Sequence, residues 1–162
     1  MHVPLSKFLG QVAQQGSWYG GGTAAALGVG LSAALLEKLA HHPADRKRLK
    51  QIRQRSLWLA ERDAAVFAGV IAACRTGRRG TFRQALRAAV EVPCRVYEDA
   101  QAVRALGRKI QRTIAPRLQS DVRCAMALAE AGQAGAQGFI NANLAWLNDR
   151  AYALRIRRRL RR

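Results

Sequence analysis

The chain has 162 residues, 49% of them hydrophobic, which suits one folded domain and excludes a disordered chain. Its 28 lysines and arginines against 10 acidic residues give a net charge of +18, which fits an anionic partner such as nucleic acid, anionic lipid or a poly-carboxylate ligand. The three cysteines are far apart and form no metal-binding motif, so we expect no metal site and cysteines packed as small hydrophobic side chains in a reducing compartment.

The first two predicted elements are helices. Apolar residues recur at helical spacing over residues 4–15, and Gly16 ends this helix. The second helix is expected over residues 23–41, with Thr23 as its N-cap. Its alanines, glycines and leucines leave almost no polar face, so we expect it to be buried on nearly all sides at the centre of a bundle or a dimer. Its apolar stretch is too short to span a membrane.

The rest of the chain also shows helical patterns only. A long helix is expected over residues 43–75. The next begins with a capping box at residues 81–84, is kinked or broken at Pro93 and ends at Gly107, and a short helical piece follows. Ser120 is a suitable N-cap for the last long helix, which reaches about residue 148.

These helices predict an all-α fold, an up-and-down bundle of long antiparallel helices around a buried central helix rich in glycine and alanine. Residues 1–150 form this single domain. Residues 151–162, which are rich in arginine, are expected to form a basic C-terminal tail in solvent.

Three consecutive glycines, Gly20, Gly21 and Gly22, precede Thr23 at the start of the second predicted helix. A glycine backbone can approach a ligand closely, and the free N–H groups of a first helical turn suit an anion or a polar ligand. The alternative is a flexible turn between two helices. The spacing matches neither the dinucleotide-binding motif nor the phosphate-binding lysine loop.

Several features follow one another along the chain: the glycine triplet, Asp63-Ala64 in an apolar helix, Val92-Pro93 in an alanine-rich helix, Ser120-Asp121 after a loop, and the pair Asn141 and Asn143. This order resembles the cyclodeaminase/cyclohydrolase family, which includes the cyclodeaminase domain of formiminotransferase-cyclodeaminase and the methenyltetrahydrofolate cyclohydrolases. The resemblance implies a cytoplasmic, homodimeric, all-α enzyme of one-carbon metabolism that acts on a tetrahydrofolate derivative. The loops at residues 17–19 and 116–119 differ from the family pattern.

The resemblance also implies roles for individual residues. It makes Asp121 the acid/base and Asp63 its support. The substrate would be bound by residues from the glycine loop, the Ser-Asp loop and the last helix, namely Gly20, Gly21, Gly22, Thr23, Ser120, Asn141 and Asn143. Each polar residue has a structural alternative: a helix-start residue for Asp121, an ion pair with an arginine for Asp63, and a hydrogen bond between helices for the two asparagines.

The implied reaction is hydrolysis of 5,10-methenyltetrahydrofolate to 10-formyltetrahydrofolate, or deamination of formiminotetrahydrofolate. Both pass through a cationic one-carbon centre, which a carboxylate can stabilise while it moves a proton. Two alternatives belong to other classes: a catalytically inactive helical relative that binds a polyanion such as nucleic acid, and a purely structural helical dimer. Polyanion binding would weaken steeply with added salt.

Overall fold

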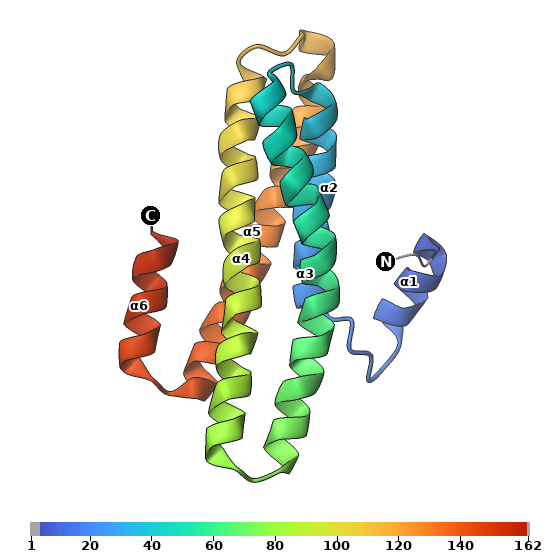
Figure 1. Ribbon diagram of the computed structural model, residues 1–162. Helices are drawn as coiled ribbons and strands as arrows, with labels where there is room; N and C mark the ends of the chain where they lie inside the picture. Colours follow the sequence, from blue (N-terminus) through green and yellow to red (C-terminus); the bar gives the residue numbers. More distant parts are fainter. Residues whose placement is uncertain (1–3, 162) are drawn as a thin grey trace.

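The structure, a computed structural model, describes residues 4–161, and its elements are helices (Figure 1). In chain order they are α1 (Leu5–Ala13), α2 (Gly21–Leu39), α3 (Pro43–Arg75), α4 (Arg79–Gln111), the short 3₁₀ helix η1 (Pro116–Leu118), α5 (Gln119–Leu147) and α6 (Arg150–Leu160). Helices α2 to α5 alternate in direction, and α2 contacts α3, α4 and α5. The predicted all-α bundle around a helix rich in glycine and alanine is therefore confirmed.

Close backbone contact explains why α2 and α5 carry so many small residues. A Cβ atom on Gly132 of α5 would lie 2.6 Å from Cγ2 of Val29 and 2.8 Å from the Ala25 carbonyl of α2. Helix α2 is long and apolar enough to cross a membrane, but half of that stretch is buried inside the bundle, as in a core helix. It is not buried on all sides, because Leu31 is 59% exposed.

Helix α4 differs from its prediction at both ends. It begins at Arg79, so the expected capping box lies inside the helix, and it continues without interruption to Gln111. Gly107 does not end it: a Cβ atom there would lie 3.0 Å from Cγ of Met126, so this glycine packs closely against α5. Ser120 is likewise not an N-cap, because α5 begins one residue earlier, at Gln119.

The segment expected to be a solvated tail is mostly helix α6. Asp149 caps this helix by accepting a hydrogen bond from the Tyr152 N–H (3.0 Å). Tyr152, Ile156 and Leu160 recur every four residues and are buried, and α6 packs against α4. The tail prediction was wrong for residues 151–160, because the arginines between these positions obscure the apolar face; Arg162 lies outside the described residues.

The three cysteines are free and differ in burial. Cys94 is buried, and burial raises the pKa of its thiol to about 12. Cys74 and Cys124 are exposed, so the expectation of hydrophobic packing is confirmed for Cys94 alone.

Unequal helix lengths leave a space in the bundle. Helices α3 and α4 each contain 33 residues, whereas α2 contains only 19. The difference corresponds to about 21 Å of helix, and α3 and α4 continue well past the start of α2 (Figure 1). The glycine triplet lies at this point, where the central helix begins.

Candidate functional site

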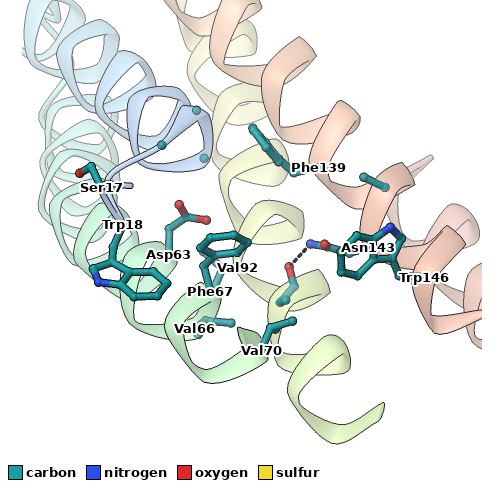
Figure 2. A pocket seen from close by; sticks show the side chains of 15 residues that line it. Ser17, Trp18, Asp63, Val66, Phe67, Val70, Val92, Phe139, Asn143 and Trp146 are labelled. Atoms are coloured by element: carbon teal, nitrogen blue, oxygen red, sulfur yellow. Dashed lines mark hydrogen bonds between the residues drawn. The ribbon is translucent and has the colours of Figure 1, made fainter. Parts of the chain in front are cut away.

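A pocket of about 300 Å³ opens where α2 begins (Figure 2). Its walls carry four aromatic side chains, Trp18, Phe67, Phe139 and Trp146, which are between 39% and 66% exposed. The rings of Trp18 and Phe67 meet edge to face at 6.0 Å. Exposed aromatic side chains gathered around one cavity provide stacking surfaces for a flat ring, so the pocket is the candidate site.

Asp63 of α3 lies in this pocket, directly against the first turn of α2. The Oγ1 hydroxyl of Thr23 donates to its Oδ2 (3.2 Å), and the Thr23 backbone N–H also donates to the carboxylate. Because α2 begins at Gly21, Thr23 lies inside the first turn and is not the N-cap that the sequence predicts. A carboxylate from another helix thus satisfies a free N–H at the positive end of α2.

Two of the three glycines make close contacts with residues of the pocket. A Cβ atom on Gly22 would lie 2.6 Å from Oδ2 of Asp63 and would contact Oδ1 as well. A Cβ atom on Gly21 would lie 2.8 Å from the ring of Phe139. No side chain fits at either position without moving a residue of the pocket.

The environment of Asp63 suits a group that both takes up and releases a proton. Burial raises the pKa of the Asp63 carboxyl, while the hydrogen bonds from Thr23 lower it part of the way. The Thr23 hydroxyl also lies 3.3 Å from the Ala60 carbonyl, so it has an acceptor when Asp63 is protonated. Within residues 4–161 the structure gives Asp63 no arginine partner, in contrast to the ion pair considered from the sequence.

Asn143 of α5 lies in the pocket beside a defect in α4. Pro93 lies inside α4 and has no N–H, so the carbonyl of Ala89, four residues earlier, lacks its helical partner. Nδ2 of Asn143 donates to this carbonyl at 2.8 Å, the bond drawn as a dashed line in Figure 2. The predicted hydrogen bond between helices is therefore present, and α4 is not broken at Pro93.

Other predicted site residues lie elsewhere. Asn141 is exposed and accepts a hydrogen bond from Gln137 (3.2 Å). Ser120 and Asp121 lie in the first turn of α5, where Asp121 Oδ2 is 3.0 Å from Nζ of Lys38. Lys38 belongs to the last turn of α2 and Thr23 to its first, so Asp121 and Asp63 are about 22 Å apart along α2.

The structure therefore brings together only part of the predicted set. Within one chain, the pocket is lined by Gly20, Gly21, Gly22, Asp63 and Asn143, and Thr23 donates a hydrogen bond to Asp63. The roles of Asp121, Ser120 and Asn141 stay predictions. Over residues 4–161, no group of three or more histidine, cysteine or acidic side chains is placed to hold a metal ion.

The aromatic walls were not among the predicted site residues, although the sequence carries a signal for them. Phe139, Asn143 and Trp146 follow the helical spacing that places side chains on one face, as do Asp63 and Phe67. A polar residue flanked by exposed aromatic residues on the same face indicates a ligand site more strongly than it indicates a core.

Comparisons with known proteins agree with the all-α fold. The chain matches the family described as formiminotransferase-cyclodeaminase over residues 4–162. The crystal structure of formiminotetrahydrofolate cyclodeaminase from Thermotoga maritima matches with a TM-score of 0.87 and 21% sequence identity, covering 99% of this chain and 87% of that chain. No curated protein matches the chain. The solved structure shows a shared fold, and the family match over nearly the whole sequence shows that this chain belongs to the formiminotransferase-cyclodeaminase family.

Proposed function

We propose that this chain is a tetrahydrofolate enzyme that deaminates a formimino group, with hydrolysis of the 5,10-methenyl ring as the related reaction of the same site. The observation that carries the proposal is the Asp63 carboxylate, held by the start of α2 inside an aromatic pocket. The family match and the named activity of the Thermotoga maritima protein support the same reaction class.

Three polar groups of the pocket can accept hydrogen bonds from a ligand. The Asp63 carboxylate, the Ala89 carbonyl and Oδ1 of Asn143 are all acceptors. A reduced pterin carries several N–H donors and has a flat pyrimidinone ring, and a protonated formimino group is a cation that also donates. The aromatic walls and the carboxylate therefore complement the two ends of such a substrate.

Asp63 can perform the proton transfers that deamination requires. Attack of the folate N10 on the formimino carbon forms a C–N bond, and the Asp63 carboxylate accepts the proton that N10 loses. Asp63 then gives this proton to the amino group on the same carbon, that C–N bond breaks, and ammonia leaves with its electron pair. The resulting methenyl cation lies beside the Asp63 carboxylate, which stabilises it.

One absorbance measurement tests both reactions, because 5,10-methenyltetrahydrofolate is the product of one and the substrate of the other. Purified protein with 5-formiminotetrahydrofolate should produce methenyl absorbance and ammonia. If the protein is a cyclohydrolase instead, added 5,10-methenyltetrahydrofolate will decay faster than in buffer. No acceleration of either reaction would contradict the proposal and favour the polyanion-binding alternative.

The pH dependence should respond to Thr23. Thr23→Val removes the hydroxyl that stabilises ionised Asp63, so the pKa of Asp63 rises further and the acidic limb of the kcat/KM profile moves to higher pH. Thr23→Ser keeps the hydroxyl and should retain the wild-type profile. Equal profiles for Thr23→Val and wild type would contradict Asp63 as the titrating group.

The free energy of unfolding should also depend on pH through the ionisation of Asp63, and its direction follows from the pKa of this group. Burial holds the pKa of folded Asp63 above its unfolded value. Its contribution to the free energy of unfolding is therefore fully present below the unfolded pKa and is lost as pH rises through the folded pKa.

A further inference from the structure

The side-chain amide of Asn143 is held in one orientation. Its Nδ2 donates to the Ala89 carbonyl, which can only accept, so a flipped amide would place two oxygens against each other. This carbonyl is free because Pro93 supplies no N–H to it. Pro93 and Ala89 together therefore determine which end of the Asn143 amide is left for a ligand.

The end of the Asn143 amide that is left for a ligand is Oδ1, a hydrogen-bond acceptor. Asn143 is half-buried and lines the pocket, and the hydrogen bonds found among residues 4–161 include none to its Oδ1. Asp63, the acceptor proposed for the one-carbon group, comes from α3, whereas Asn143 comes from α5, across the pocket in Figure 2. The two acceptors can thus contact different parts of one ligand.

We propose that Oδ1 of Asn143 accepts a hydrogen bond from the ring N–H of the pyrimidinone edge of the pterin, and so determines specificity for that edge. The inference rests on the proposed function, because it assigns a part of the same substrate. A reduced pterin has a ring N–H and an amino group side by side on this edge, and both donate. A locked acceptor rejects a ring that carries a methyl group in place of this N–H, because it leaves Oδ1 without a partner.

A binding cycle with two ligands and two proteins tests this contact directly. The ligands are 5,6,7,8-tetrahydropterin and its 3-methyl derivative, which lacks the ring N–H. Binding is followed by quenching of tryptophan fluorescence, since Trp18 and Trp146 line the pocket. Wild type should bind tetrahydropterin at least about tenfold more tightly than the methyl derivative, and in Asn143→Leu this preference should fall to about twofold or less.

Gln137→Leu is the matched control, because Gln137 carries an amide side chain six residues away on the same helix and does not line the pocket. It should keep the wild-type preference. Thermal unfolding checks that each variant is folded, and Asn143→Ala, which should show the same loss, replaces Asn143→Leu if the larger side chain prevents folding.

The outcomes separate this inference from the proposed function. An equal preference for tetrahydropterin in wild type and Asn143→Leu, with folate turnover intact, would overturn the role of Asn143 alone. No binding of tetrahydropterin and no folate turnover would overturn both.

Discussion

Replacement of Asp63 by asparagine is expected to lower kcat/KM for the folate substrate by a factor of about 10³ while the protein stays folded. Asparagine has nearly the same shape and still accepts hydrogen bonds from Thr23, but it cannot take up and release a proton at this site. The methenyl absorbance assay measures the loss, and thermal unfolding followed by circular dichroism confirms the fold.

The informative comparison is Asp121→Asn, because the family resemblance assigns the acid/base role to Asp121. Asp121 forms a surface ion pair with Lys38, whose side chain is 63% exposed, so its loss should change the unfolding free energy by less than about 1 kcal/mol. From its position outside the pocket, we expect Asp121→Asn to keep most of its activity. If Asp121→Asn is inactive and Asp63→Asn is active, the pocket is not the catalytic site of this chain.

Gly22→Ala is expected to reduce both stability and activity. The added Cβ atom would lie 2.6 Å from Oδ2 of Asp63, so the carboxylate must leave the first turn of α2 and lose its hydrogen bonds to Thr23. Overpacking of this kind costs about 2 kcal/mol of unfolding free energy. A displaced acid/base group should lower kcat/KM by a factor of about 10². Urea denaturation and the absorbance assay measure the two effects.

Gly69→Ala provides the contrasting control. Gly69 lies inside α3, and a Cβ atom there would have nothing within 4 Å. Alanine should therefore raise the unfolding free energy by about 0.5–1 kcal/mol, the usual difference between the two residues inside a helix, without affecting turnover. Equal stability and activity in Gly22→Ala and Gly69→Ala would contradict the proposed contact between α2 and Asp63.

Much of the fold could be predicted from local patterns. The third helix matches its predicted range, Pro43–Arg75, because a proline in the first turn and a break at Gly77 mark its ends. The predicted helix end at Gly107 is wrong, because this glycine packs against the side chain of Met126 on another helix, a contact that local sequence does not show. The signal for α6 was similarly hidden, since its arginines dominate the composition of a segment with only three buried residues.

Individual residues of the site could be predicted from the sequence, but not which of them lie together in the fold. The glycine triplet, Asp63 and Asn143 are polar or conformationally special residues in apolar surroundings, which the sequence shows. Which of them meet depends on the length of α2 and on the register of α3 and α5 against it. Local sequence does not show that register, and so does not show that the two ends of α2 separate Asp121 from Asp63 within one chain.

The short central helix has a consequence for how this site can change. The pocket occupies the part of the bundle that α2 does not reach. Helix α2 begins far inside the bundle that the longer helices α3 and α4 define. Substitutions of the lining residues can therefore alter which molecule is accepted without abolishing the cavity. Each extra turn at the beginning of α2 would instead insert about 5.4 Å of helix into the cavity. In this bundle, the residue at which α2 begins determines how large a ligand the cavity can hold, independently of the chemistry of the lining residues.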